Sequence, residues 1–159
     1  MPQEPVRPAP ALKKIDLAIA RLRLLLADIG ARETSIEDQR RTYHEQRAKL
    51  VQFSIYGEGT LDSVLAMMAD VEERLAHVEA TARSLGAVRK RAEMELESLQ
   101  LTKGIEEAKV LLHELRARQA GPVDGGDALS PAEIQAEIAR LQSLINEASE
   151  RAAKTIGRR

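Results

Sequence analysis

The sequence predicts an all-α fold: a long antiparallel two-helix coiled-coil hairpin with a shorter C-terminal helix packing at its base. Three observations predict this fold. They are the composition, a seven-residue spacing of apolar residues, and a glycine-containing turn between two helical stretches of equal length. Charged residues make up 31% of the 159 residues and aromatic residues 2%, whereas soluble domains average about 25% charged residues. The chain therefore has too little bulky apolar material for a thick globular core.

Net charge and cysteine content narrow the classes of function. The 24 basic and 25 acidic side chains nearly cancel, so no overall charge attracts nucleic acid or an anionic membrane. The chain has no cysteine, which removes disulfides, zinc-thiolate sites and thiol catalysis. No apolar run approaches the ~20 residues of a membrane span, and the start MPQEPVRPAPA has no hydrophobic signal core. We expect a cytoplasmic protein, or an extracellular one if a signal peptide has been removed.

The first helical stretch begins after a proline-rich segment. Four prolines within residues 2–10 predict a disordered tail over 1–10, and helix is expected from Ala11, with residues 12–52 forming the first long helix. Its main apolar stripe repeats every seven residues: Ile15, Leu22, Ile29, Ile36, Tyr43 and Leu50. A companion stripe is apolar at Leu12, Ile19 and Leu26, then polar at Glu33, Arg40 and Arg47. Such paired stripes are typical of a coiled-coil seam, and the unbroken repeat favours continuity through Gly30 over a break there.

A turn is predicted near residues 53–60, within VQFSIYGEGTLDSV (51–64). Thr60 can cap the second helix, whose seam over 61–101 has the same spacing. Phe53 either closes the seam or contributes to a tip, and Met67 and Met68 fit either seam packing or an adaptable groove. Four residues are the candidates for a partner-binding tip, because an aromatic side chain flanked by acidic groups can anchor an interface: Ile55, Tyr56, Glu58 and Asp62.

The hairpin is expected to span 11–119, with a linker over 120–129 and an amphipathic helix over 130–157. After Leu99 the apolar stripe jumps by two residues, which predicts a bend or a change of packing partner near 102–104. Ser130, Pro131 and Glu133 form the start signal of the last helix, a capping box with proline in the first turn. Leu129 would staple to Ile134 across this helix start.

Apolar residues off the seam need a cover. Leu17, Leu24 and Leu25 lie on faces that a two-helix hairpin leaves in water. We expect the C-terminal helix to fold back on 101–119 and cover this base, within one chain or across a dimer. The residues expected to pack the base or the oligomer are Leu17, Leu24, Leu25, Ile134, Ile138, Leu141 and Ile145.

No pattern of catalytic or ligand-binding residues stands out. The three histidines are far apart, and Glu73 with His77 provides only two ligands on one helix face. The glycines lack the spacing of a phosphate-binding loop, and no serine lies in a nucleophile elbow. We therefore expect no enzymatic activity, no metal site and no cofactor.

The leading hypothesis is a non-enzymatic scaffold or adaptor that self-associates, most simply as a homodimer, and presents the hairpin tip to a protein partner. A nucleic-acid-machinery factor whose acidic tip enters an enzyme channel is an alternative, although neutral charge counts against phosphate binding. We expect neither a nucleic-acid partner nor a membrane partner, except through a protein complex.

A family resemblance suggests another alternative. The segment YGEGTLDSVLAMMADVEERLAHVEA, residues 56–80, resembles the helix-turn-helix segment in the coiled-coil regulatory regions of secreted peptidoglycan hydrolases and hydrolase activators. In both, an aromatic residue, a glycine turn and a leucine-rich stretch follow a long charged helix, and the similarity extends over residues 35–120. The resemblance implies a regulatory coiled coil that binds a partner in a cell-wall or membrane complex.

Overall fold

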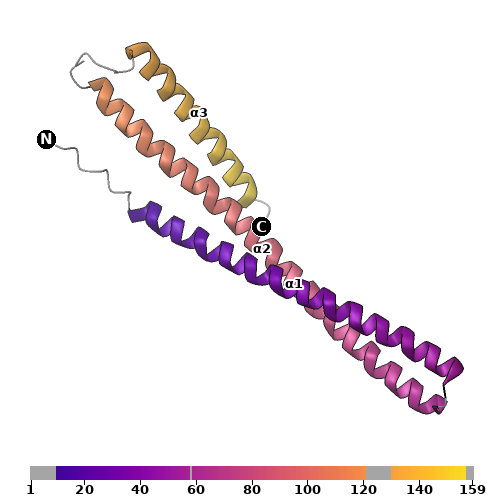
Figure 1. Cartoon of the computed structure of the whole chain (residues 1–159). Helices are drawn as coiled ribbons and strands as arrows, with labels where there is room; N and C mark the ends of the chain where they lie inside the picture. Colours follow the sequence, from indigo (N-terminus) through magenta and orange to yellow (C-terminus); the bar gives the residue numbers. More distant parts are fainter. Residues whose placement is uncertain (1–9, 58, 121–129, 157–159) are drawn as a thin grey trace. The chain divides into compact units, whose positions relative to one another are not determined.

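The computed structural model describes residues 10–57, 59–120 and 130–156, and within these ranges the chain forms three α-helices and no strand (Figure 1). The helices are α1 (Pro10–Tyr56), α2 (Leu61–Ala120) and α3 (Pro131–Ile156). Helix α1 packs on α2, and α2 packs on α3, which confirms the predicted all-α class. Residues 1–9 of the predicted tail, Glu58 and residues 121–129 of the predicted linker lie outside the described ranges.

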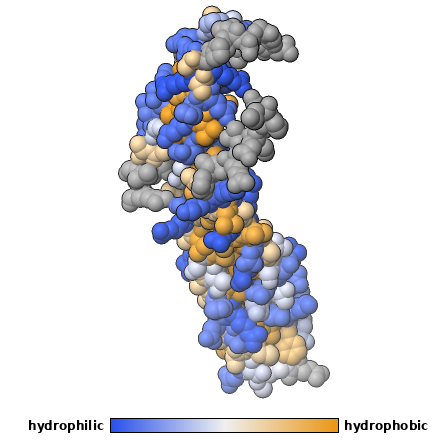
Figure 2. All heavy atoms as spheres, turned by 90° about the vertical axis from the view of Figure 1, so that its left-hand side faces the viewer, coloured by the Kyte–Doolittle hydropathy of each residue, from blue (hydrophilic) through white to orange (hydrophobic). Residues whose placement is uncertain are grey.

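The chain divides into two compact units, one of residues 23–93 and the other of residues 1–22 with 94–159. The first unit contains α1 and α2 only. Its most buried apolar side chains follow the predicted seam, at Ile29 in α1 and, in α2, at steps of three, four, seven or fourteen residues that agree with the spacing predicted for 61–101: Val64, Val71, Leu75, Val78 and Ala92. On the face drawn in Figure 2, hydrophobic side chains gather in patches among hydrophilic ones. The seven-residue repeat thus identifies the side chains that this unit buries.

Both ends of α1 differ from the prediction. The helix begins at Pro10, because proline is tolerated in the first turn, where the backbone amides have no helical partner. At the other end it continues to Tyr56, four residues beyond the expected end. The Gly57 N–H donates to the Phe53 carbonyl at 2.7 Å, so helical hydrogen bonding extends to the first glycine. The link to α2 is therefore only residues 57–60.

Helix α1 passes through Gly30 without interruption, as predicted. The Thr34 hydroxyl donates to the Gly30 carbonyl at 3.1 Å, one helical turn back. This side-chain bond is compatible with a continuing helix. The predicted cap of α2 is confirmed, since the Ser63 N–H donates to Thr60 Oγ1 at 3.3 Å.

In the other unit, α3 packs along the last third of α2. The buried cluster between them consists of Ala108, Leu112, Leu115, Ile134, Ile138 and Leu141, with Ile145 packed at its edge. The predicted start of α3 at Pro131 is confirmed together with its capping box. The Ser130 N–H donates to Glu133 Oε2 at 2.7 Å, and the Glu133 N–H donates to Ser130 Oγ at 3.3 Å.

The apolar stripe of α2 shifts while the helix itself continues from Leu61 to Ala120. Before the cluster with α3 begins at Ala108, α2 contacts α1 within this unit, where Lys103 Nζ lies 2.7 Å from Asp16 Oδ1. Residues 102–104 thus lie where the contacts of α2 pass from α1 to α3, and a bend at this point stays a prediction. The apolar jump after Leu99 moves the buried stripe toward α3.

The off-seam leucines of α1 remain open to solvent in the single chain. Leu17, Leu24 and Leu25 are 53%, 72% and 41% exposed. The apolar face of α3 is occupied by the cluster with α2 instead. Cover of these leucines by a second chain stays a prediction.

Candidate interaction site

Exposed apolar side chains are concentrated around the link between α1 and α2. Of the thirteen large apolar side chains that are exposed in the described ranges, seven fall within residues 51–67. We call these seven the tip surface: Val51, Phe53, Ile55, Tyr56, Leu61, Leu65 and Met67. Lone exposed apolar residues are ordinary, but a group of this size at one end of a helix pair is typical of an interaction site.

The predicted tip residues have different positions. Ile55 and Tyr56 lie in the last turn of α1 and are 65% and 87% exposed. Asp62 is exposed in the first turn of α2, where its carboxylate stabilises the positive end of the helix dipole. Glu58 lies outside the described residues. Partner binding by these four residues stays a prediction.

The Phe53 ring lies against the two glycines of the link. A Cβ atom added at Gly57 would lie 2.5 Å from Phe53 Cδ2 and 2.5 Å from the Phe53 carbonyl oxygen, and one added at Gly59 would lie 2.5 Å from Phe53 Cε1. Real side chains do not approach so closely. The link therefore needs glycines to make room for the ring, although Phe53 itself is still 44% exposed.

An apolar hollow opens beside the tip surface. Its volume is about 570 Å³, within the ~300–1,000 Å³ range of ligand pockets. It is lined by Gln46, Lys49, Leu50, Phe53, Met67, Asp70 and Val71. Met67 thus belongs to a groove, whereas the neighbouring Met68 is half-buried. The hollow as a whole has no sequence motif, and the methionine pair below the turn was its only signal in the sequence.

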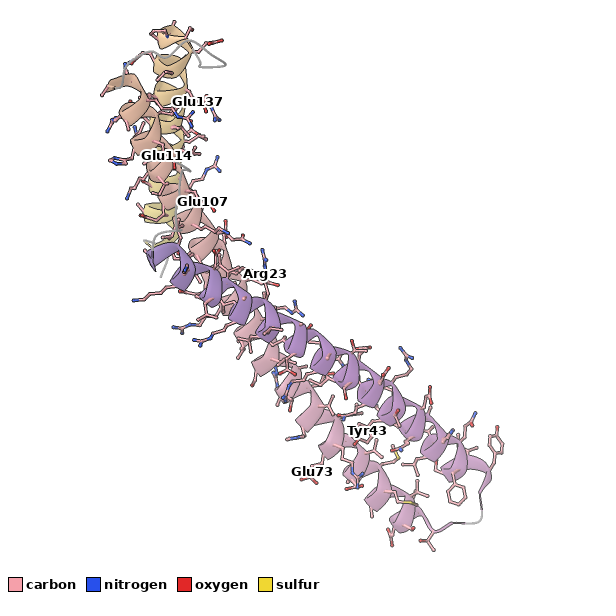
Figure 3. The ribbon with its side chains drawn as sticks, turned by 60° about the vertical axis from the view of Figure 1, so that its left-hand side comes forward. Arg23, Tyr43, Glu73, Glu107, Glu114 and Glu137 are labelled. Carbon is pink, nitrogen blue, oxygen red and sulfur yellow. The ribbon has the colours of Figure 1, made fainter. Side chains whose placement is uncertain are left out.

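Two opposite charges flank this hollow without pairing to each other. Lys49 on α1 has no ion-pair partner in the described parts of the chain. Asp70 on α2 pairs with Arg74 one turn along the same helix, at 3.1 Å. The Asp70 charge raises the pKa of Arg74, and the hydrogen bond that Arg74 donates to the Tyr43 hydroxyl is the next cause. Tyr43 lies between α1 and α2 (Figure 3).

Three ion pairs connect α1 to α2 within residues 23–93. Arg89 binds Glu33 through two hydrogen bonds of 2.6 and 2.8 Å, and Arg40 binds Glu79 through two of 2.8 and 3.1 Å. The third, Arg47 with Glu72, is longer at 4.0 Å. The hydrogen bond from Arg89 is the main cause that lowers the pKa of Glu33. We call these three pairs the ion-pair ladder.

The ladder uses the residues at which the companion stripe turns polar. A guanidinium that donates two hydrogen bonds to one carboxylate has a fixed fork geometry, so the two rungs of this kind, at Glu33 and Arg40, favour one alignment of the two helices over a shifted one. The members are partly exposed, and such pairs contribute little to stability individually. Their main effect is to define which residues face one another.

The described residues contain no group of three or more His, Asp or Glu side chains placed to hold a metal ion. Glu73 points away from α1 (Figure 3), and His77 lines a second hollow of about 280 Å³ together with Ile36 and Val78. Within the described ranges, Glu73 and His77 therefore have no third side chain placed to bind a metal ion with them.

No helix within the described ranges is long and apolar enough to cross a membrane. Comparisons with protein-family models, with curated proteins and with solved structures find no match to this chain. The similarity of residues 56–80 to hydrolase-regulating coiled coils accordingly stays a prediction.

Proposed function

We propose that this chain is a non-enzymatic interaction protein, a scaffold or adaptor in which α1 and α2 form an antiparallel coiled-coil hairpin that presents its tip to a protein. The single observation that carries the proposal is the concentration of seven exposed apolar side chains within residues 51–67. Interfaces are built around apolar and aromatic anchors of this kind.

The ion-pair ladder supports the hairpin part of the proposal. Residues 33, 40 and 47 of α1 pair with residues 89, 79 and 72 of α2, in reverse order. Reverse order is what antiparallel helices require. A link of only four residues between the helices is also within the usual length for neighbouring antiparallel helices.

The side chains at the tip favour binding to an apolar protein surface over the alternative in which an acidic tip enters the channel of a nucleic-acid enzyme. Ile55 and Tyr56 are the most exposed large side chains of the last turn of α1, whereas Asp62 is the acidic residue described next to the link. An acidic tip that enters a nucleic-acid enzyme would need a cluster of carboxylates at this point. The protein-partner hypothesis therefore has the stronger support.

The proposal is tested by affinity capture from the native host with Ile55→Ser/Tyr56→Ser, called the tip variant. Both side chains point into solvent, so the substitution removes apolar surface without opening the core. We expect the tip variant to lose the partners that the wild-type chain retains.

The matched control is Leu24→Ser/Leu25→Ser, called the base variant, which removes two exposed leucines elsewhere on α1. It should keep the same partners as the wild type. If the tip variant captures the full set of partners, the tip surface is only a bend between helices and the proposal is wrong.

A further inference from the structure

The hollow and two exposed residues of the tip surface, Ile55 and Tyr56, occupy the same end of the helix pair. The apolar side chains that line the hollow are Leu50, Phe53, Met67 and Val71. Ile55 and Tyr56, which project beyond it, are 65% and 87% exposed. A surface that has both a recess and an apolar projection can match a second copy of itself.

The charges at the rim of the hollow have the same self-matching character. Lys49 lies on the α1 rim and Asp70 on the α2 rim, and no ion pair joins them. In a dimer with a two-fold axis, a contact from residue 49 to residue 70 occurs twice, because each chain presents both residues. One such arrangement would give Lys49 a partner and would add a second cation to Asp70.

We propose that the hollow receives Ile55 and Tyr56 of a second copy of this chain, related by a two-fold axis, so that Lys49 of each chain meets Asp70 of the other. This inference rests on the proposed function and names the protein partner at the tip as the chain itself. It places self-association at the tip, whereas the sequence predicted it at Leu17, Leu24 and Leu25.

An isologous contact has a charge pattern that mutagenesis can test directly. The variants Lys49→Asp and Asp70→Lys each place like charges opposite one another at both copies of the contact. In an equal mixture of the two variants, both contacts of a mixed dimer join aspartate to lysine again. Only a contact between two chains restores the pairing in this way, because neither variant carries a repaired pair within one chain.

The experiment is sedimentation velocity on the full chain over a concentration series. We expect the wild type to dimerise, each single variant to self-associate about tenfold more weakly, and the equal mixture to recover dimer close to the wild-type level. Both side chains are exposed, and circular dichroism of each variant checks that its helix content equals that of the wild type.

The tip and base variants complete the design. The tip variant should weaken the dimer, and the base variant should leave it unchanged. The inference is overturned if the wild type stays monomeric at every soluble concentration, if the mixture recovers no dimer, or if only the base variant dissociates it. Captured partners that depend on Ile55 and Tyr56 in a monomeric protein would keep the proposed function and reject the self-pairing.

Discussion

At the scale of single residues, the link between α1 and α2 is determined by one ring and two glycines. The ring and the carbonyl oxygen of Phe53 occupy the space that a side chain at Gly57 would need, and the ring occupies the space that one at Gly59 would need. Neither glycine has a positive φ, so close approach, and not backbone freedom, explains their presence. The sequence identified the aromatic residue and the glycines, but their mutual contact depends on the three-dimensional path of the link.

Four glycine-to-alanine substitutions distinguish the effect of the Phe53 contact from the low helix propensity of glycine. Gly57→Ala should destabilise the chain most, since its Cβ would meet the Phe53 backbone as well as the ring. Gly59→Ala should cost less, because only the side chain needs to move. Gly86→Ala and Gly104→Ala meet nothing within 4 Å and should each stabilise α2 by about 1 kcal/mol, the difference in helix propensity.

Thermal unfolding followed by circular dichroism measures all four variants. The order from least to most stable should be Gly57→Ala, Gly59→Ala, wild type, and then the two α2 variants. If Gly57→Ala is as stable as Gly104→Ala, the Phe53 contact does not determine the link.

At the scale of the elements, the sequence identifies where helices begin better than where they end or whom they contact. Ser130 and Glu133 predict their own hydrogen bonds, because a capping box is complete within four residues. Tyr56 was assigned to the predicted turn at 53–60 because of the glycines that follow it, although no residue before Gly57 stops the helix. Glu33 was recognised as a polar position beside the seam, but its partner Arg89 lies 56 residues away. Such a partner depends on the alignment of the two helices.

The capping box makes the start of α3 sensitive to pH. Hydrogen bonds from the Ser130 backbone and hydroxyl lower the pKa of Glu133 below its ordinary value of 4.5. A carboxyl with a lower pKa in the folded state adds stability above its unfolded pKa, and this stability is lost as the pH falls through the folded pKa. The stability difference between wild type and Glu133→Gln should therefore shrink as the pH falls from neutral to below 4.5.

Thermal unfolding at a series of pH values measures that difference, with Glu150→Gln, near the other end of α3, as the matched control. Ser130→Ala should also destabilise the chain by about 1 kcal/mol at neutral pH, the usual cost of a lost helix cap. A stability difference for Glu133→Gln that is constant across the pH series would show that its carboxylate does not contribute to the cap.

At the scale of the whole molecule, one continuous helix contributes to two separate cores. Within residues 23–93, α2 buries Val64, Val71 and Val78, and in the other unit it buries Leu112 and Leu115 against α3. The seven-residue repeat predicted the first core, and the amphipathic pattern of 130–157 predicted the second. The packing of the C-terminal helix on 101–119 was also predicted, whereas the choice between a bend and a change of partner near 102–104 was left open, because a shift of the apolar stripe fits both.

Two cores on one helix should be separable by substitution. Ile29 and Leu141 are 2% and 3% exposed, and truncation of such a buried side chain to alanine costs roughly 2–5 kcal/mol. The buried side chains of α3 in the described residues pack against residues 108–115 of α2. We therefore expect Leu141→Ala to accelerate amide hydrogen exchange in α3 and in residues 108–115 of α2, and to leave 64–78 protected. Ile29→Ala should do the reverse, with faster exchange in 64–78 and protection retained in α3.

Hydrogen exchange with mass spectrometry resolves these segments in one measurement. Equal acceleration of both segments by either variant would show that the chain opens as one cooperative unit, in which α2 transmits the loss of one core to the other.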